Sequence, residues 1–469
     1  MIFNSLQFIV FFIIVTAAYF VVPYRFRWFW LLLASCYFYM AFVPVYILVL
    51  GFTIVIDYLA GILIGRHQGR TRGLLLAASL IANIGVLAVF KYYNFINYNI
   101  TKILHLVDYV NPIPILSILL PVGLSFHTFQ AMSYTIEVYK GNQKAERHFG
   151  IYALYVMFYP QLVAGPIERP QNILHQFREK HDFDFERFKA GLVRMAFGFF
   201  KKVVIADRLA MVVDHSYGNI DMQNGSTLLI ATIFYSFQIY CDFSGYSDIA
   251  IGAAQIMGFK LMENFKAPYL SKSIPEFWKR WHISLSTWFR DYMYIPLGGN
   301  RVKVSRWYFN LMAVFLISGL WHGANWTFVA WGLLHGIYQV CAVEKDKLFN
   351  RFNIKISDNW LMKALQVAAT FSLVTFAWIF FRAAKPVHAL KIIDKILHSS
   401  IHDALNFGLN NAEMWLCVFL IVALLFKEKF YNAVSVTNDY RFWSLIVFLV
   451  AGCYFLGVFG AKQFIYFQF

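Results

Sequence analysis

Long apolar runs recur along the whole chain and are separated by short polar stretches. Many runs reach about 18 residues, the length with which an α-helix crosses a hydrocarbon layer of roughly 30 Å. The stretch 307–343 is long enough for two such helices, and 226–258 for one or two. We therefore predict an all-α polytopic membrane protein with roughly 11–13 membrane segments, at residues 5–22, 28–47, 48–64, 74–93, 114–134, 149–165, 190–212, 226–258, 307–343, 362–382, 412–426 and 442–460.

The most charged long stretch, Lys260 to Arg306, interrupts this pattern in the middle of the chain. Within it, apolar residues recur at helical steps of three and four, which predicts an amphipathic helix in or under the membrane interface. Pro275 suits its first turn, and PLGGN (296–300) ends the helical pattern. Because irregular backbone at membrane depth must line a cavity or be buried in protein, we expect this region to wall a chamber. Its apolar positions are Phe277, Trp278, Trp281, Leu285, Trp288 and Phe289.

The composition agrees with a membrane protein, since 59% of the 469 residues are hydrophobic and only 14% are charged. An ordinary soluble domain has roughly 25% charged residues. The net charge of +16 is typical of cytoplasmic loops rich in Lys and Arg, and no basic groove with interleaved aromatic residues indicates nucleic acid. We therefore expect no nucleic-acid partner.

Basic residues also predict the orientation of the chain. Arg25 and Arg27 follow the first span, and GRHQGRTRG (65–73) follows the third. The positive-inside rule places both loops in the cytosol and the amino terminus outside. The first run has no basic residue before it and no small-residue cleavage site after it, so we expect a retained span. With no internal repeat or linker, the simplest organisation is one integral-membrane domain over residues 1–469.

Two histidines stand in one of the most apolar stretches, SGLWHGANWTFVAWGLLHG (318–336). Basic residues flank 307–343 on both sides, so His322 is expected near the turn between two helices. Gly319 and Gly323 let backbone or a substrate approach its ring closely. A lone membrane histidine can simply tie helices together, but a neutral imidazole in a membrane chamber can also accept a hydroxyl proton.

His282 lies 40 residues before His322, and a short helix plus one span can bring both rings into one chamber. His335 lies thirteen residues beyond His322, roughly 20 Å along a straight helix, which favours a structural role. Zinc takes three or four ligands, and no HxxxH or HExxH spacing accompanies these histidines. We expect general-base chemistry and no metal site.

A second polar cluster, YCDFSGYSDIAIG (240–252), places Asp242 and Tyr246 inside an apolar run. Membrane carboxylates usually face a partner or a wet cavity. Two interpretations fit Asp242: an ion pair with a basic residue such as Arg290 or Arg280, or contact with a substrate. In a third stretch, FYPQLVAGPIERP (158–170), prolines and a glycine predict either a helix break at a cavity or the exit from the bilayer.

These stretches carry a resemblance to a known family. EFWKRWHISLSTWFRDYMYIPLGGNR (276–301), followed by SGLWHGANWTFVAWGLLHG, is similar to the membrane-bound O-acyltransferase family, and within it to the alginate O-acetyltransferase branch of bacterial polysaccharide acetylases. PVGLSFHTFQAMSYTIEVYKG, FYPQLVAGPIERP and CDFSGYSDIAIGAAQIMGF resemble further stretches of that branch in the same order. The resemblance runs from about residue 1 to the terminal FIYFQF and so covers essentially the whole chain.

The resemblance implies a bundle with re-entrant or interfacial helices around a central funnel or tunnel. It makes His322 the essential histidine and His282 a second polar position, often asparagine in other members. It implies transfer of an acetyl group from a cytosolic thioester such as acetyl-CoA, with no bound cofactor, to an acceptor outside the bacterial cytoplasmic (inner) membrane. A separate extracytoplasmic SGNH-type acetyltransferase is the implied partner for the final step onto polysaccharide.

In that mechanism His322 takes the proton of an acceptor hydroxyl as the hydroxyl attacks the thioester carbonyl. His282 and Asn325 are candidate donors to the developing negative charge on the carbonyl oxygen. The basic face that includes Arg280 and Arg290 is a candidate site for the phosphates of a nucleotide donor. The candidate substrate contacts are Asn325, Trp321, Asp242, Tyr246, Arg280 and Arg290.

Three alternatives stay open at this point. The first is a teichoic-acid D-alanyltransferase whose donor is a carrier-protein thioester, although residues 276–301 and the chain length resemble the acetylase branch better. The second is a lipid acyltransferase with a lateral opening for a long donor tail. The third is a non-enzymatic transporter of a lipid-linked sugar that uses the histidines as proton relays.

Overall fold

The computed structural model describes residues 1–118, 120–163, 165–354, 357–400, 403–430, 438–459 and 464–465. Within these ranges the chain is built from helices and turns, and no strand occurs. The predicted all-α fold is therefore confirmed. The chain divides into two compact units, residues 1–195 with 247–262 and residues 196–246 with 263–469. The single integral-membrane domain stays a prediction.

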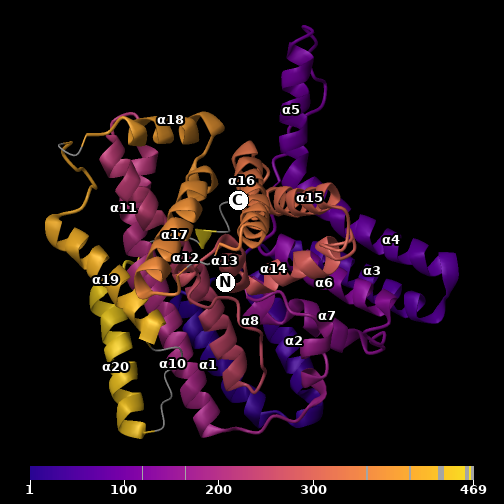
Figure 1. Ribbon diagram of the computed structural model, residues 1–469. Helices are drawn as coiled ribbons and strands as arrows, with labels where there is room; N and C mark the ends of the chain where they lie inside the picture. Colours follow the sequence, from indigo (N-terminus) through magenta and orange to yellow (C-terminus); the bar gives the residue numbers. More distant parts are fainter. Residues whose placement is uncertain are drawn as a thin grey trace. The chain divides into compact units, whose positions relative to one another are not determined.

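The first unit is made of the N-terminal helices (Figure 1). A short π-helical segment, Ala88–Tyr92, joins α4 to α5. The helical backbone is interrupted at Phe158, between α7 and α8. This break confirms the helix interruption predicted for residues 158–170. The helices are α1 (Leu6–Val21), α2 (Tyr24–Met40), α3 (Ile47–Arg66), α4 (Gly69–Leu87), α5 (Tyr93–His105), α6 (Leu124–Lys140), α7 (Phe149–Met157), α8 (Tyr159–Leu162), α9 (Pro170–Ile173) and most of α10 (Phe185–Phe199).

A buried carboxylate joins helices of the first unit. Asp57, on α3, is fully buried, and its Oδ1 accepts hydrogen bonds from Ser79 Oγ at 2.6 Å and Asn83 Nδ2 at 2.9 Å, both on α4. Ser79 also donates to Thr135 on α6. Since a buried polar group is costly unless it is hydrogen-bonded, this network stabilises the packing of α3, α4 and α6.

The second unit contains both candidate catalytic histidines. Its longest helix, α12 (Gly225–Ile256), is continuous, so the 226–258 stretch is one segment, and its last residues belong to the first unit. Two short segments of this unit, Phe200–Ala206 and Arg290–Tyr294, are π-helical. The other helices are α11 (Asp207–Gly218), α13 (Ile274–Arg280), α14 (Ile283–Phe289), α15 (Val304–His322), α16 (Trp326–Arg351), α17 (Trp360–Arg382), α18 (Pro386–Leu397), α19 (Asn411–Phe430) and α20 (Asp439–Leu456).

Five helical stretches of the described residues are long and apolar enough to cross a membrane: Pro44–Arg66, Gly69–His105, Trp326–Arg351, Trp360–Arg382 and Asp439–Leu456. Helix α1 is apolar but shorter. Several other predicted segments are helical as well but are shorter, less apolar or more charged. The protein is a multi-pass membrane protein.

Candidate functional site

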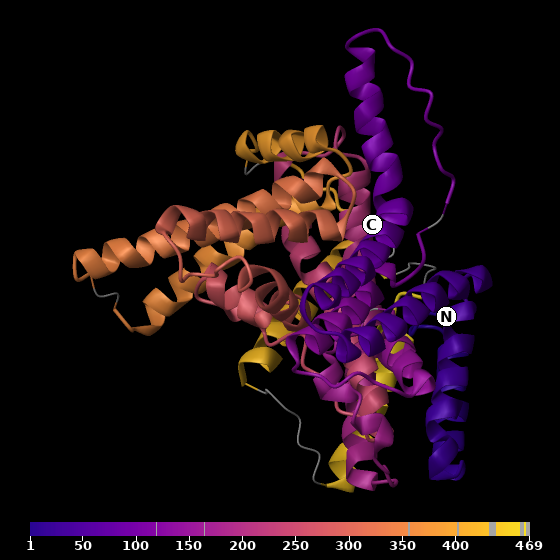
Figure 2. The same ribbon diagram turned by 90° about the vertical axis from the view of Figure 1, so that its right-hand side faces the viewer.

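The two helices α15 and α16 form the predicted hairpin, with His322 as the last residue of α15. They run side by side (Figure 2) and are joined by residues 323–325. A Cβ atom on Gly319 would lie 2.3 Å from the carbonyl oxygen of Phe328, and one on Gly323 would lie 2.1 Å from the Phe328 ring. Both glycines therefore permit the close approach expected of them.

The His322 ring is held among aromatic side chains of three helices. Its centroid lies 5.0 Å from that of Trp321 on α15, 5.0 Å from Trp331 on α16 and 5.2 Å from Phe381 on α17, all at steep interplanar angles. The residue is only 3% exposed. These aromatic rings cover most of the His322 surface.

The segment that carries His282 is two short helices, and the prediction of one amphipathic helix was wrong. Helix α13 ends at Arg280, α14 begins at Ile283, and His282 between them has a left-handed φ of 44°. The expected apolar face is nonetheless buried, apart from Trp278, which is half-buried. The chain changes direction at His282 itself, and its imidazole is buried in the core of the second unit.

Asn264 fixes the orientation of the His282 ring. Its Oδ1 lies 3.1 Å from Nδ1 of His282 and also accepts the Oγ–H and backbone N–H of Ser284. Because these contacts identify the Asn264 atom as an acceptor, Nδ1 of His282 carries a proton. In the neutral ring, Nε2 then holds the lone pair. The expected donation from His282 to a carbonyl oxyanion therefore needs either the protonated ring or Nδ1 itself.

The Trp321 side chain contacts the rings of both candidate histidines. The Trp321 ring lies 5.0 Å from the His322 ring and 6.3 Å from the His282 ring, between centroids. All three residues are buried. This arrangement supports the expectation that an amphipathic segment and one span can place both imidazoles in one part of the bundle.

Asn325 caps the helix that follows His322. Its Oδ1 accepts the backbone N–H of Thr327 at 3.1 Å, and its Nδ2 donates to the carbonyl of Ala384 at 3.0 Å. Asparagine is among the preferred residues at this N-cap position. One amide N–H therefore remains for the oxyanion role that the sequence suggested.

Asp242 forms a buried ion pair, but with a different partner from those expected. Its Oδ1 lies 2.5 Å from Nζ of Lys202, which also contacts Asp207 at 2.8 Å. Its Oδ2 accepts the backbone N–H of Ile465 at 2.8 Å. The predicted partners were wrong because the π-helical segment Phe200–Ala206, a neighbour of α12, supplies a buried cation. Tyr246 is fully buried and stacks on Phe464, with centroids 4.6 Å apart.

The two arginines of the basic segment bind carboxylates of their own segment. Arg280 pairs with Glu276 at 2.7 Å, one helical turn earlier, and Arg290 pairs with its neighbour Asp291 at 2.7 Å. Arg290 is exposed and Arg280 is half-buried. Their contact with donor phosphates stays a prediction, as does the absence of a metal site. Among the residues the structure describes, no group of three or more His, Cys, Asp or Glu side chains converges on one point.

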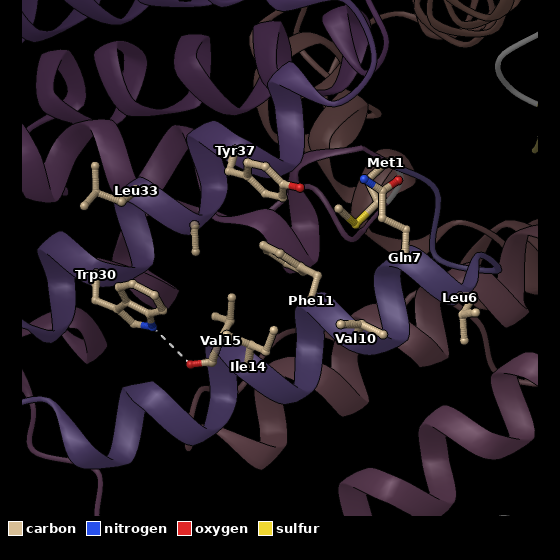
Figure 3. Close-up of a pocket in the computed structure, with 11 residues that line it drawn as sticks. Met1, Leu6, Gln7, Val10, Phe11, Ile14, Val15, Trp30, Leu33 and Tyr37 are labelled. Atoms are coloured by element: carbon tan, nitrogen blue, oxygen red, sulfur yellow. Dashed lines mark hydrogen bonds between the residues drawn. The ribbon is translucent and has the colours of Figure 1, made fainter.

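A separate pocket of about 590 Å³ lies between α1 and α2 in the first unit (Figure 3). Apart from Gln7 and the polar ends of Trp30 and Tyr37, its lining is apolar, and the Trp30 indole donates to the carbonyl of Val15 at 3.0 Å. It holds no histidine or carboxylate side chain. Both candidate histidines lie in the second unit, and the predicted funnel or tunnel stays a prediction.

Sequence reasoning missed several residues of the site. Asn264 lies 18 residues before His282 and belongs to no recognisable motif. Ser284 is easier to suspect, because it is a polar residue only two positions after His282. The rings of Trp331 and Phe381 look like ordinary core residues in sequence. The one sequence signal for the aromatic surroundings of His322 is the presence of Trp321, Trp326 and Trp331 in the same stretch, 318–336.

Comparison with known proteins identifies similar sequences over most of the chain. Residues 148–383 match the model of MBOAT, the membrane-bound O-acyltransferase family. A probable alginate O-acetylase, AlgI, of Pseudomonas aeruginosa is 37% identical over 444 residues, covering 92% of this chain and 82% of the relative. A peptidoglycan O-acetyltransferase of Helicobacter pylori is 38% identical, with 78% and 72% covered. A teichoic acid D-alanyltransferase of Bacillus subtilis is 29% identical, with 57% and 69% covered.

Proposed function

Because the chain belongs to the membrane-bound O-acyltransferase family, we propose that this O-acyltransferase moves an acetyl group from a cytosolic thioester, acetyl-CoA, to a hydroxyl of an extracytoplasmic polysaccharide. The observation that carries the proposal is the pair of buried histidines, His282 and His322, in contact with the same indole, that of Trp321. Both lie within the residues that match the family.

The reaction needs one base and one proton return. His322 takes the proton of the acceptor hydroxyl while the hydroxyl oxygen attacks the thioester carbonyl carbon. When the tetrahedral intermediate collapses, the carbon–sulfur bond breaks and the thiolate leaves. The imidazolium of His322 then returns its proton to the thiolate, so that the products are an acetyl ester and a free thiol.

His282 serves as a second polar group on the acceptor side. With Nδ1 bonded to Asn264, the neutral ring presents the lone pair of Nε2, which can accept a hydrogen bond from a second hydroxyl of the acceptor sugar and so orient the attacking one. Holding reactants in an attacking geometry can lower the barrier by several kcal/mol, on the order of 7–11 in the best intramolecular cases. The orienting role replaces the oxyanion donation expected from sequence.

The orientation of the chain in the membrane determines the side from which each substrate reaches the site. We place the amino terminus outside the bacterial inner membrane. The basic stretch 65–73 covers the end of α3, the turn at residues 67–68 and the start of α4, and Arg25 and Arg27 lie at the start of α2. The positive-inside rule places both in the cytosol. A thioester from the cytosol then meets an acceptor from the other side. An extracytoplasmic SGNH-type acetyltransferase is the proposed partner that completes the transfer onto the glycan.

The alternatives fit less well. The D-alanyltransferase relative is 29% identical over 57% of the chain, against 37% over 92% for the alginate O-acetylase relative. A non-enzymatic transporter does not agree with membership of an acyltransferase family. The relatives whose names state an O-acetyl transfer, an alginate O-acetylase and a peptidoglycan O-acetyltransferase, cover most of this chain and favour acetyl over a long acyl chain.

Acetyl analysis of surface glycans tests the proposal. Mass spectrometry of glycans from cells with and without the protein should show O-acetyl esters only when it is present. D-alanyl esters in place of acetyl esters would support the alternative donor, and unchanged esters of both kinds would contradict the proposal. Purified protein with labelled acetyl-CoA should release free CoA in step with glycan acetylation only when the glycan and the proposed partner transferase are both added.

A further inference from the structure

His335, on α16, is a buried junction beside the site. The residue is 0% exposed. The indole N–H of Trp278, on α13, donates a hydrogen bond to Nδ1 of His335 across 3.3 Å. Helix α13 ends two residues before His282, so this bond links α16 to the short helix that positions one candidate catalytic ring.

Apolar rings extend the junction to the helix of the other histidine. Phe315, on α15, lies over the His335 ring with centroids 6.1 Å apart and planes at 24°, and it meets Trp278 at 5.2 Å. Phe277 of α13 lies nearly parallel to His335 at 6.4 Å. His335 therefore contacts α13, which precedes His282, and α15, which ends in His322.

Trp331 connects His335 to the His322 ring directly. It lies one helical turn before His335 on α16, so both face the same side. Its centroid is 4.9 Å from His335 and 5.0 Å from His322, and it is fully buried. A movement of the His335 ring therefore changes the surface against which His322 rests.

The Trp278 hydrogen bond also gives His335 one orientation. Rotating the ring by 180° about its bond to Cβ would place a carbon in front of the indole N–H and leave that donor without its acceptor. A partly buried donor that has lost its acceptor is unfavourable, because it has also given up its hydrogen bonds to water. The ring is thus locked by one hydrogen bond and by the parallel faces of Phe315 and Phe277.

We propose that His335 is a positioning residue of the transfer reaction, which fixes the His282 backbone through Trp278 and the His322 ring through Trp331. The inference rests on the proposed function, since it assigns His335 to the site of acetyl transfer. A misplacement of about 1 Å can cost on the order of 10²-fold in rate. A residue that serves stability alone lowers the amount of folded protein and leaves the rate per folded molecule unchanged.

The test compares four variants of the full-length protein purified in detergent. His335→Phe keeps a flat ring and removes the acceptor, and His335→Asn keeps an acceptor close to the position of Nδ1. Trp278→Phe keeps His335 and removes the donor together with part of the indole ring. The matched control is Trp307→Phe, because the Trp307 indole also donates to a side chain, Tyr294 at 2.8 Å, but stands at the other end of α15 from His322.

Initial rates are measured with labelled acetyl-CoA as donor and an extract of cells that lack the protein, which supplies both the acceptor glycan and the proposed partner transferase. We expect His335→Phe to lower kcat per folded molecule at least tenfold, with the KM for acetyl-CoA changed less than threefold. His335→Asn should return kcat to within about threefold of the parent protein, and Trp307→Phe should stay within about twofold.

A kcat for His335→Phe equal to that of the Trp307→Phe control would overturn the inference. If His335→Phe does not fold, Trp278→Phe decides, because it keeps His335 and loses the same indole atoms as the Trp307→Phe control. A kcat equal to that of the control overturns the inference again. His322→Ala is assayed in parallel. Full activity of that variant contradicts the proposed function, whereas loss in His322→Ala with normal rates in His335→Phe contradicts the positioning role alone.

Discussion

Gly319 of α15 faces Gly332 of α16 so closely that a Cβ atom on Gly319 would lie 3.3 Å from the Cα atom of Gly332 and 2.3 Å from the Phe328 carbonyl oxygen. Backbone cannot yield as a flexible side-chain end can. We therefore expect Gly319→Ala to push the two helices apart at the end that carries His322, with a cost of about 1–3 kcal/mol. Thermal unfolding in detergent and acetyl transfer per folded molecule should both fall.

The control for this prediction is a helical glycine with open surroundings. A Cβ atom on Gly51, in α3, would meet nothing within 4 Å, so Gly51→Ala should leave unfolding unchanged or raise stability by up to about 1 kcal/mol. If Gly319→Ala behaves in the same way as Gly51→Ala, the tight contact between the helices is not what holds His322 in place.

The ion pair of Lys202 makes a prediction about stability. Lys202→Met leaves the carboxylates of Asp207 and Asp242 buried without their cation. Removal of one partner from a buried pair typically costs about 3–5 kcal/mol, because a charge stays behind in a dry environment. Denaturant unfolding followed by tryptophan fluorescence should shift strongly toward lower denaturant concentration.

Lys363→Met is the matched control, since Lys363 pairs with Asp358 at 3.0 Å on the surface. An exposed pair contributes about 0–1 kcal/mol, so this variant should unfold as the parent protein does. Equal stability of both variants, together with a loss of transfer only in Lys202→Met, would instead support the substrate contact once considered for Asp242.

His282 carries two separable properties, a ring and a left-handed backbone. His282→Gly keeps the backbone conformation and removes the ring, whereas His282→Ala also strains the backbone at a φ of 44°. Both should lose transfer activity on the order of 10²-fold or more if the ring orients the acceptor. His282→Asn should retain far more, since asparagine tolerates this conformation and offers polar atoms.

Kinetics and donor binding separate the explanations for His282. Binding of acetyl-CoA, measured by calorimetry on purified protein, should be unchanged in His282→Gly. Normal activity of His282→Gly alongside a defective His282→Ala would mean that only the backbone turn matters, and the orienting role of the ring would then be wrong.

Much of the hairpin formed by α15 and α16 could be predicted from the sequence. Two apolar runs with basic ends predict the helices, Gly319 and Gly323 predict close packing, and Asn325 is a favourable N-cap residue for the second helix. Each of these signals is local, because it depends on residues within one or two helical turns. The placement of His322 at the turn between α15 and α16 follows from them.

Other features depend on tertiary packing and have no local signal. The apolar positions from Phe277 to Trp288 keep helical phase across the break at His282, so the pattern predicts one helix where the structure has two. Lys202 pairs with Asp242 across 40 residues, and Asn264 reaches His282 across 18. The packing of the folded core determines which residues become partners. From sequence alone, Arg280 and Arg290 of the amphipathic segment are therefore expected where the structure has Lys202.

The most direct test of the account is the rate of acetyl transfer by His322→Ala, measured with labelled acetyl-CoA against His398→Ala, a variant of an exposed histidine in the same unit. General-base catalysis is typically worth about 10²–10⁴-fold. We predict a loss of at least that size for His322→Ala, with normal folding and donor binding, and none for His398→Ala. Transfer by His322→Ala at the rate of the parent protein would contradict the assignment of His322 as the base.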